Sequence, residues 1–501
     1  MQERTFNPKI ATILLLALLV RLLGIISRPV WYDEAFAILF SEKGLSAMLY
    51  GTLAPTGAGS ADIHPLGYYT ILWLWMKIFG ESLVATRLLS ILAGLISVYL
   101  VYLIALQALS DPKTARLGML FAALAPFQIH YAQEIRMYSF LAMWLLLATY
   151  AYQRGSKTGN WRWWILFSVS AALAQYTHNL AAFYLIALAL LPVFQKNWTA
   201  LPSLVLAGLG ALVLYLPWAI QLPAQFSKVQ SAYWVERPDI SKLFTLLIVY
   251  ITNTPLPTGL VAAVLAIVLI IMMIGIRQTI RYSRQTKTNE GPWLFYLAFA
   301  PPILLFLFSQ WRPVYIERAL LPSGAIFCAW LAWVITKTNL PNSARYALLG
   351  LLSLASVLGI YQHVLYNGFP YGPFRQLDLS LRQRLKHQDM ILHSNKLSVL
   401  PAILFDRKLP QSFIGDPPGS RTDTLASATQ HVLGIKSESD IQSATDKAGR
   451  VWFVIYQRSI EEDQAGEPAT HPDIEYLNSN FNLESEETWD GLRVLLYTKK
   501  P

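Results

Sequence analysis

The sequence predicts a polytopic helical membrane protein that carries a small α/β domain, and three observations support this prediction. Of its 501 residues, 54% are hydrophobic and only 14% are charged, whereas a soluble surface of this size needs more charge. Apolar runs of about 17–25 residues, the length of a membrane-spanning helix, recur from Ile10 to about His363. Beyond residue 364 the apolar runs shorten to strand length. We therefore expect a membrane domain over 1–363 and an α/β domain over 364–501.

Eleven segments are expected to span the membrane: 10–27, 85–107, 115–128, 137–153, 162–176, 179–194, 200–217, 257–276, 293–309, 319–336 and 346–363. The first contains Arg21 and lacks a following small-residue cleavage site, so we expect a retained helix and not a signal peptide. Residues 65–79 are apolar but short, and we expect them to lie along or dip into the outer interface. Residues 34–50 and 240–252 are expected to form further interfacial helices.

The loops between these segments predict the orientation of the chain. One set of loops is basic and contains Lys113, Arg116, Arg154, Lys157, Arg162, Lys196, Arg277, Arg281, Arg284, Lys287, Lys337 and Arg345. Because cytoplasmic loops are enriched in Lys and Arg, the N-terminus is expected in the cytoplasm and the C-terminal domain outside. The same bias explains the formal net charge of +10, so no nucleic-acid partner is expected.

Neither the cysteine content nor the C-terminal domain predicts chemistry of its own. Cys328 is the only cysteine and lies in an apolar run, which excludes a disulfide within the chain and disfavours a thiolate metal site. Strand-like runs at 389–393, 450–456 and 493–498 and a helix-like segment at 376–387 suit a small α/β domain. It has no glycine-rich phosphate loop, so we expect it to support the membrane domain or to bind the acceptor.

Two adjacent carboxylates, Asp33 and Glu34, follow the first apolar run at the expected membrane surface. They stand next to Trp31 and Tyr32 and precede a helix-prone stretch. Burial at such a place raises the pKa of a carboxylate toward the range that is useful for a general base. The same residues also fit an interfacial helix that Asp33 caps, with the aromatic rings in a membrane belt.

A second motif contains His64, Pro65 and Tyr68. A proline can occupy the first turn of a helix, so the His64 imidazole would lie at the positive end of that helix, where anions bind. A plain helix start with interfacial tyrosines is the simpler interpretation of this motif alone. His178 belongs to a smaller external cluster and is by default an interfacial histidine with satisfied hydrogen bonds.

Two further external elements carry charge. Glu134 and Arg136 lie at the mouth between two expected spans, where the carboxylate could bind sugar hydroxyls and the guanidinium fork suits a phosphate. A local ion pair is the alternative, although such pairs contribute little at exposed sites. Arg318 opens a span from the outer side and could hold a lipid phosphate, while a lone arginine there more often snorkels to ordinary headgroups.

The order and spacing of these motifs resemble the GT-C superfamily of membrane glycosyltransferases. The similarity starts with an apolar first helix followed by Trp-Tyr-Asp-Glu at 31–34 and continues with His-Pro-Leu at 64–66. It then includes Gln-Glu-x-Arg-Met-Tyr at 133–138, after a proline-bearing helix end. Within the superfamily, the chain is similar to the family 39-like branch with protein O-mannosyltransferases and lipid A aminoarabinose transferases. The resemblance is strong over 10–195, looser to about 336 and weak beyond.

The resemblance implies an enzyme that transfers a sugar from a polyprenyl-phosphate carrier to an acceptor lipid, glycan or protein, with inversion at the anomeric carbon. By position, Asp33 would be the general base or a carboxylate that orients the acceptor, with Glu34 beside it and Glu134 as the second acidic residue. The residues implied to bind substrate are Tyr32, His64, Tyr68, Arg136, Tyr138, His178 and Arg318. A divalent metal held by Asp33, Glu134 and His64 is a candidate cofactor. The acidic motif here is Asp-Glu and not Asp-x-Asp, so the resemblance leaves the dependence on a metal open.

This hypothesis requires the acidic motifs around Asp33 and Glu134 to meet in one external pocket. The branch that the chain resembles places that pocket on the outer face of a bacterial plasma membrane, in contact with membrane lipids. The main alternative is a transporter or flippase for a lipid-linked sugar. Such proteins place ionisable residues near the midplane, often in two related halves, whereas here the carboxylates follow external loops and no repeat is evident. Another enzyme of lipid-linked glycans, a polymerase or a ligase, is the closer alternative.

Overall fold

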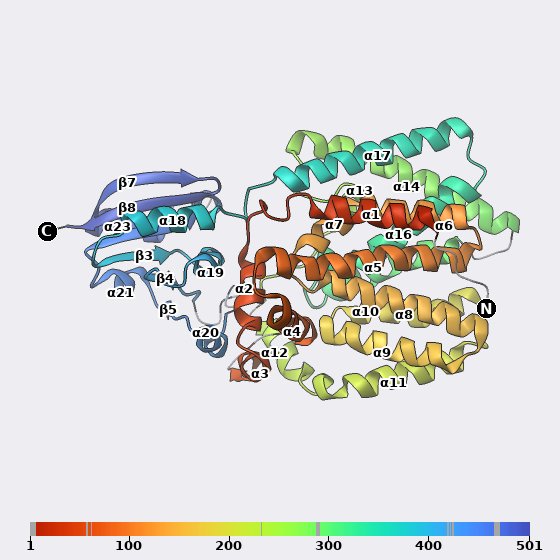
Figure 1. Cartoon of the computed structure of the whole chain (residues 1–501), viewed down its shortest axis with the longest axis horizontal. Coiled ribbons are helices and arrows are strands. Elements are labelled where there is room, and N and C mark those ends of the chain that lie inside the picture. The colour runs from red at the N-terminus through yellow and green to blue at the C-terminus, as the bar shows by residue number, and fades with distance from the viewer. Residues whose placement is uncertain are drawn as a thin grey trace.

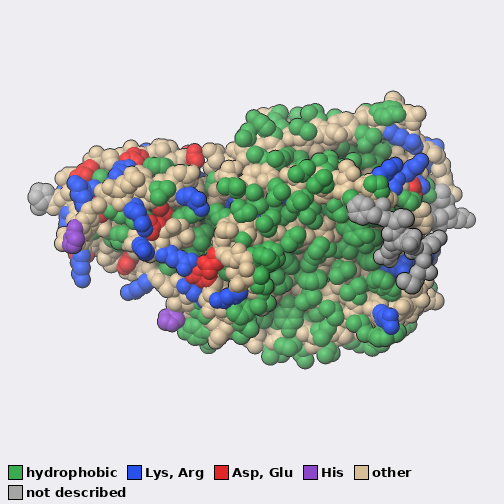
Figure 2. All heavy atoms as spheres, in the orientation of Figure 1, with side chains coloured by type: hydrophobic (Ala, Val, Ile, Leu, Met, Phe, Trp, Pro, Cys, Tyr) green, Lys and Arg blue, Asp and Glu red, His purple; other side chains and the backbone are tan. Residues whose placement is uncertain are grey.

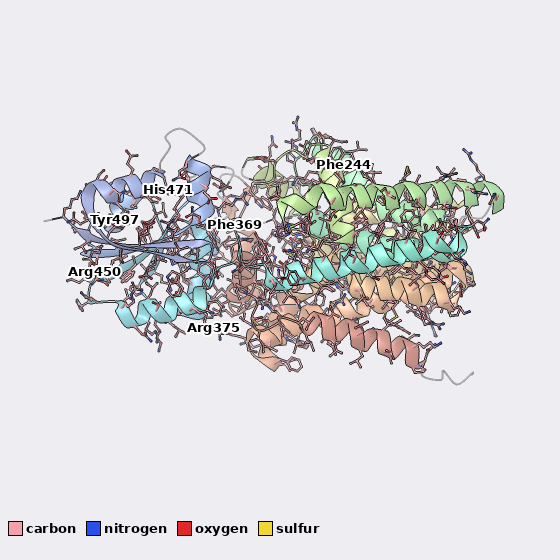
Figure 3. The ribbon with its side chains drawn as sticks, turned by 90° about the horizontal axis from the view of Figure 1, so that it is seen from above. Phe244, Phe369, Arg375, Arg450, His471 and Tyr497 are labelled. Carbon is pink, nitrogen blue, oxygen red and sulfur yellow. The ribbon has the colours of Figure 1, made fainter. Side chains whose placement is uncertain are left out.

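The computed structural model describes residues 7–56, 59–61, 63–231, 233–286, 291–417, 420, 422, 425–464 and 471–500. The molecule is elongated, with a bundle of long helices at one end and a sheet covered by helices at the other (Figure 1). Figure 3 labels Phe369 where the chain passes from the bundle to the sheet. The mainly helical architecture with a C-terminal mixed sheet confirms the expected fold class at this level of detail.

A helix lies in each segment expected to span the membrane: α1 (Pro8–Leu22), α5 (Leu83–Leu109), α6 (Pro112–Leu124) followed by α7 (Pro126–Gln133), α8 (Tyr138–Thr158), α9 (Trp161–Thr177), α10 (Ala181–Gln195), α11 (Leu201–Ala219), α14 (Thr258–Thr286), α15 (Pro292–Ser309), α16 (Leu321–Lys337) and α17 (Asn342–Leu365). Within the described ranges, six helices are long and apolar enough to cross a membrane by length and composition. The chain is thus an integral membrane protein with several candidate spans. The count of eleven stays a prediction.

The surface of the bundle agrees with a membrane location. Figure 2 shows a broad hydrophobic band over the helices, with charged side chains toward the two ends. Large apolar side chains such as Leu206, Val213 and Val357 are more than half exposed on this surface. Contiguous exposed apolar surface of this extent is rare on soluble monomers and is stable in contact with lipid.

Short helices lie in the segments for which interfacial helices are expected: α2 (Tyr32–Ser41), α3 (Leu45–Leu53), α4 (Gly67–Phe79) and α13 (Ser241–Ile251). A further short helix, α12 (Leu222–Ser231), follows α11, and the strands β1 (Pro55–Thr56) and β2 (Gly59–Ser60) pair after α3. Figure 1 places α2, α3, α4 and α12 at the end of the bundle next to the sheet. The 13 residues of α4 rise by about 20 Å, which is shorter than the roughly 30 Å of bilayer hydrocarbon.

The C-terminal part contains α18 (Phe374–Arg384), β3 (Asp389–His393), α19 (Lys396–Phe405), β4 (Gln411–Ile414), α20 (Ser427–Leu433), β5 (Ser437–Glu438), α21 (Ile441–Thr445), β6 (Arg450–Tyr456), α22 (Gln457–Gln464), α23 (Pro472–Asn480), β7 (Phe481–Trp489) and β8 (Leu492–Lys499). The strand order is β5-β4-β3-β6-β8-β7. Strands β5, β4, β3 and β6 are parallel, whereas β8 is antiparallel to β6 and β7. The expected strands coincide with β3, β6 and β8.

The C-terminal part packs on the short helices of the bundle. Helix α19 packs against α2, and α20 packs against α3. Arg407 forms an ion pair with Glu42 just after α2, and the Thr429 hydroxyl donates a hydrogen bond of 2.9 Å to the carbonyl of Gly51. Because α2 also carries Asp33, the C-terminal part supports the helix that positions this carboxylate.

Candidate active site

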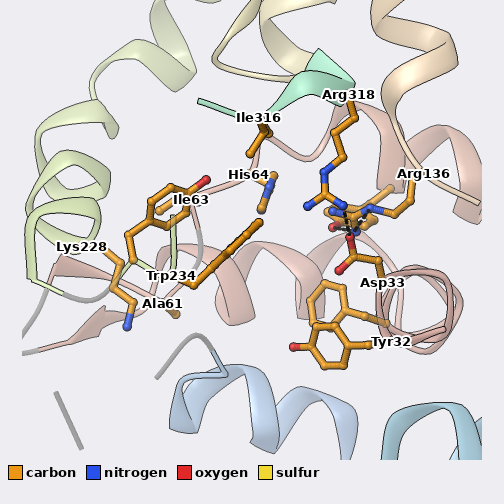
Figure 4. Close-up of a pocket in the computed structure, with 13 residues that line it drawn as sticks. Tyr32, Asp33, Ala61, Ile63, His64, Arg136, Lys228, Trp234, Ile316 and Arg318 are labelled. Carbon is orange, nitrogen blue, oxygen red and sulfur yellow. Dashed lines mark hydrogen bonds and ion pairs between the residues drawn. The ribbon is translucent and has the colours of Figure 1, made fainter. Parts of the chain in front are cut away.

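A cavity of about 100 Å³ lies at the end of the bundle next to the sheet (Figure 4). Five of the residues predicted from the sequence line it: Tyr32, Asp33, His64, Arg136 and Arg318. They come from α2, from the segment before α4, from the connection between α7 and α8, and from the turn of 3-10 helix η1 (Glu317–Leu320) before α16. The fold therefore brings together residues that lie far apart in the sequence.

Asp33 is the only carboxylate among the described residues of the cavity wall. Helix α2 begins at Tyr32 with Trp31 at the N-cap, so the alternative in which Asp33 caps the helix is wrong. Its Oδ2 atom lies 3.2 Å from Nη1 of Arg318 and 3.5 Å from Nε of Arg136. Figure 4 shows both guanidinium groups directed at this carboxylate. With Lys228 also in the wall, positive charges outnumber negative ones, which suits a phosphate.

The two arginines are fixed by further contacts. Arg136 Nη1 donates a hydrogen bond of 3.1 Å to the hydroxyl of Tyr69 on α4. The Arg318 guanidinium lies over the rings of Tyr138 and Trp234, at 5.2 and 5.9 Å from their centroids. Contacts of this kind stabilise a cation that is held away from water. The alternative interpretation has Arg318 extend to ordinary lipid headgroups. These contacts instead hold its guanidinium at the cavity, beside Asp33.

A close approach of two backbones places His64 beside His178. A Cβ atom on Gly67 would lie 2.6 Å from the carbonyl oxygen of Tyr176, so only glycine fits at the start of α4. The rings of His64 and His178 are then 5.6 Å apart. Pro65 lies two residues before α4, so its expected place in the first turn of the helix is wrong.

His178 is buried between α9 and α10. Burial lowers the pKa of His178 well below its usual value, and the nearby His64, Arg136 and Arg318 act in the same direction. The imidazole is therefore neutral near pH 7. Its Nδ1 atom accepts a hydrogen bond of 3.1 Å from the backbone of Leu180, which leaves Nε2 as the donor.

Glu34 lies next to Asp33 in the sequence but points away from the cavity. Its two carboxylate oxygens accept hydrogen bonds of 3.2 and 3.1 Å from Nε and Nη2 of Arg87 on α5, and Oε1 also accepts from the backbone of Ile135 at 3.2 Å. Both partners of the ion pair are fully buried. This geometry assigns Glu34 to holding α2 against the bundle and gives no support to the catalytic role expected for it.

Glu134 belongs to a buried cluster behind the cavity. Its Oε1 atom lies 3.1 Å from Nε2 of His130, 3.3 Å from the hydroxyl of Tyr371 and 3.7 Å from Nη2 of Arg28. Burial alone would raise the pKa of Glu134, but the neighbouring His130, Arg28 and Arg318 hold this pKa at about 2. The two acidic motifs do meet at one end of the bundle, yet Glu134 does not line the cavity.

The two remaining predicted residues, Tyr68 and Tyr138, are fully buried and lie behind the wall. The Tyr138 ring is 5.9 Å from that of His178, and the Tyr68 ring packs against Tyr69. Sequence reasoning missed Lys228 and Trp234 in the cavity because they lie in a long external segment without a motif. It also missed Arg28, Arg87, His130 and Tyr371 around the carboxylates. The position of Arg28 just beyond the first apolar run was an available signal, whereas Arg87 lies at the start of the expected span 85–107.

The residues expected to hold a metal do not fit one. Asp33 faces two guanidinium groups, which repel a divalent cation, while Glu134 belongs to the buried cluster and His64 lies beside His178. In the part of the chain that the structure describes, no three His, Cys, Asp or Glu residues gather as a metal site would require. We therefore derive no step that depends on a metal.

Fold and site together define a membrane protein with a charged cavity near the junction of a helical bundle and a C-terminal α/β part. Solved structures share the fold. The chain is similar to the crystal structure of ArnT from Cupriavidus metallidurans in the apo state, with a TM-score of 0.62, 12% identity and 97% of each chain covered. The structure of that protein bound to undecaprenyl phosphate gives a TM-score of 0.60. The oligosaccharyltransferase of Archaeoglobus fulgidus follows at 0.52 and 12% identity, covering 98% of this chain and 74% of that one.

Sequence comparison adds the family. Residues 63–220 match the family described as dolichyl-phosphate-mannose-protein mannosyltransferase. The chain is 32% identical over 177 residues to the undecaprenyl phosphate-alpha-4-amino-4-deoxy-L-arabinose arabinosyl transferase of Pseudomonas aeruginosa (strain UCBPP-PA14), covering 34% of this chain and 32% of that protein. The matched region thus spans about a third of the length of the curated relative. Over this region the chain is thus similar to the mannosyltransferase family, the resemblance that the motifs indicate.

Proposed function

We propose that this protein transfers a sugar from a polyprenyl-phosphate carrier to an acceptor on the extracytoplasmic face of the membrane. The observation that carries the proposal is the cavity in which Asp33 faces Arg136 and Arg318. The names of the relatives support it, because they are transferases of a sugar from undecaprenyl phosphate. Among the structural neighbours, ArnT is bound to undecaprenyl phosphate, and the archaeal oligosaccharyltransferase is in complex with a dolichol-phosphate.

Different residues of the cavity act on the acceptor and on the carrier phosphate. The acceptor hydroxyl or amine donates a hydrogen bond to Asp33, which takes the proton as the new bond forms at the anomeric carbon. The bond from that carbon to the carrier phosphate breaks, and its electrons leave with the phosphate oxygen. Arg318 and Arg136 stabilise the negative charge that develops there. A single displacement of this kind inverts the anomeric carbon.

The site disfavours a transporter or flippase. A transported substrate binds near the midplane, between two repeats that alternate their access. Here Asp33 and Lys228 of the cavity wall come from α2 and α12, which lie at the end of the bundle next to the sheet (Figure 1). A carboxylate that faces two guanidinium groups, with stacking rings around them, suits bond cleavage at a phosphate better than passage of a whole lipid.

We further propose that the protein consists of a membrane domain, 1–363, with eleven spans and an extracytoplasmic domain, 364–501. An odd number of spans places the two ends of the chain on opposite faces of the membrane. Basic side chains gather at the end of the bundle remote from the sheet (Figure 2), in line with a cytoplasmic location. Of the basic residues that predict this orientation, Lys287 lies outside the described residues.

A reporter fused after Pro501 tests this topology. We expect an alkaline phosphatase fusion to be active and a green fluorescent protein fusion to be dark, because only the former folds outside the cytoplasm of a bacterium. A fusion after Arg284, in the strongest basic loop, is the matched control and should give the opposite pair of signals. A fluorescent fusion at Pro501 would refute the orientation.

Replacing Arg318 with glutamine tests the proposed function. We expect kcat for transfer from a polyprenyl-phosphate sugar to fall by about 10²–10³, as when one donor of comparable electrostatic stabilisation is removed. Arg312→Gln is the matched control. Arg312 stacks on Trp311, six residues before Arg318, and does not line the cavity, so transfer should be unchanged. Wild-type kcat/KM in purified Arg318→Gln would contradict the proposed role of the cavity.

A further inference from the structure

A tyrosine from the junction between the bundle and the sheet reaches the layer of residues behind the cavity. Tyr371 lies beyond the last expected span and is only 5% exposed. Its hydroxyl accepts a hydrogen bond from Nη2 of Arg28 and donates one of 3.3 Å to Oε1 of Glu134. Cζ of Arg28 also lies 4.9 Å from the centroid of the tyrosine ring. Tyr371 therefore contacts both partners of the buried ion pair between Arg28 and Glu134.

The sheet fixes the segment that carries Tyr371. The Tyr456 hydroxyl, at the end of β6, donates a hydrogen bond of 2.9 Å to the carbonyl of Pro370. The rings of Tyr456 and Phe369 lie edge to face at 5.1 Å, at the junction that Figure 3 labels. The residues directly before Tyr371 are thus attached to a strand of the sheet. The position of Tyr371 in the bundle therefore depends on how the C-terminal part is docked.

The Tyr371 hydroxyl fixes the segment that carries Arg136. Its acceptor, Glu134, stands two residues before Arg136 in the connection between α7 and α8. The backbone N–H of the residue between them donates a hydrogen bond of 3.2 Å to Glu34 on α2. Consecutive residues of this segment thus have fixed partners. A shift of Glu134 would move Arg136 relative to Asp33, whose Oδ2 atom lies 3.5 Å from Nε of the arginine.

The Tyr371 ring acts in the same way on the segment that carries Asp33. It lies edge-on to the indole of Trp31, at 6.3 Å between the ring centroids. Trp31 is the N-cap of α2 and stands two residues before Asp33. The Arg318 guanidinium lies over the same indole at 5.7 Å. Tyr371 therefore contacts one residue two positions before Asp33 and another residue two positions before Arg136.

We propose that Tyr371 is a positioning residue that holds Asp33 and Arg136 in register and makes their separation depend on the docking of the C-terminal part. The inference rests on the proposed function and adds to it a role for a residue outside the cavity wall. Tyr371 does not line the cavity, so its effect on transfer passes through Trp31 and Glu134. A misplacement of about 1 Å typically costs about 10² in rate, so a small shift of this pair is enough to slow transfer.

Replacing Tyr371 with phenylalanine tests this role in the purified full-length protein. The ring remains against Trp31, and only the hydroxyl that bridges Arg28 and Glu134 is lost. Glu134 keeps its contact of 3.1 Å with His130, so the protein should fold. We expect kcat for transfer from a polyprenyl-phosphate sugar to fall by about tenfold. Tyr371→Ala also removes the contact with Trp31, and its kcat should fall by about 10².

Tyr366→Phe is the matched control. The Tyr366 hydroxyl belongs to the same junction but donates a hydrogen bond of 2.8 Å to the carbonyl of Phe369, within the segment itself. Its removal leaves the contact between Tyr371 and Glu134 in place, so kcat should remain close to that of the wild type. If Tyr371→Phe transfers sugar like Tyr366→Phe, while Arg318→Gln still loses transfer, the inference is wrong and the proposed function stands.

A double variant separates positioning from a mere loss of stability. In the Arg136→Gln background, Tyr371→Phe should cause no further loss of kcat, because the guanidinium that the hydroxyl positions is absent. A purely structural role would lower kcat by the same factor in both backgrounds, and that result would overturn the inference. If Arg136→Gln itself transfers sugar like the wild type, the proposed function is wrong at this cavity, and the role of Tyr371 is refuted with it.

Discussion

Replacing Asp33 with asparagine is expected to remove sugar transfer and leave the protein folded. The substitution keeps the shape of the side chain, and an amide oxygen can still accept a hydrogen bond from Arg318. What it removes is the negative charge that, in the proposed reaction, takes the proton of the acceptor. General-base catalysis typically contributes about 10²–10⁴ in rate, so kcat should fall by that factor. Transfer assays with purified protein and a polyprenyl-phosphate sugar measure this loss.

Glu317→Gln provides the matched control for this experiment. Glu317 lies one residue before Arg318 and pairs with Lys242 at 3.4 Å, with both side chains partly exposed. The change removes one carboxylate charge at the same end of the bundle but outside the cavity wall, so transfer should remain near the wild-type rate. Wild-type transfer by Asp33→Asn would show that Asp33 does not act as the base.

The membrane architecture could be anticipated because length and hydropathy determine it locally. A span must be about 20 residues long, and short apolar segments such as 65–79 stand out by this measure. The structure indeed gives α4 only 13 residues. The same reasoning located α2 and α13, since a mixed apolar and charged stretch forms an amphipathic helix. The local sequence pattern is sufficient to predict a helix wherever the thickness of the bilayer sets its length and hydropathy.

The cavity could be anticipated only in part, because side-chain direction depends on packing. Asp33 and Glu34 are neighbours, yet successive residues of a helix point about 100° apart, so only one of them faces the cavity. Which of the two residues faces the cavity depends on the position of Arg87 on α5, because Arg87 binds the Glu34 carboxylate. Likewise, the Tyr371 hydroxyl contacts Glu134 from beyond the last expected span. The two residues are 237 positions apart in the sequence, so no local pattern indicates the contact.

The C-terminal part illustrates how tertiary contact links supporting elements to the site. Strand-length runs predicted its sheet, but its contacts with α2 and α3 could not be deduced from them. Arg407 and Glu42 have ordinary surface residue types, and only their juxtaposition shows where this part docks. Its contribution to the site is therefore positional, through the helix that carries Asp33.

Replacing Glu34 with glutamine is expected to destabilise the protein and to leave its chemistry intact. Glu34 and Arg87 form a fully buried ion pair with two hydrogen bonds, and Arg87 also donates to the carbonyls of Ile25 and Arg28. Removing one charge leaves the Arg87 guanidinium buried without a counter-charge, which typically costs about 3–5 kcal/mol. A clear decrease in the melting temperature of the purified protein should follow.

The control and the alternative outcome distinguish support from catalysis at this position. Glu81→Gln, at an exposed position before α5, should change the unfolding free energy by less than about 0.5 kcal/mol. Glu34→Gln protein that remains folded in a cold assay should transfer sugar with a kcat close to that of the wild type, because Glu34 does not line the cavity. A variant with an unchanged melting temperature and a large loss of kcat would instead place Glu34 in the reaction, as the neighbouring carboxylates first suggest.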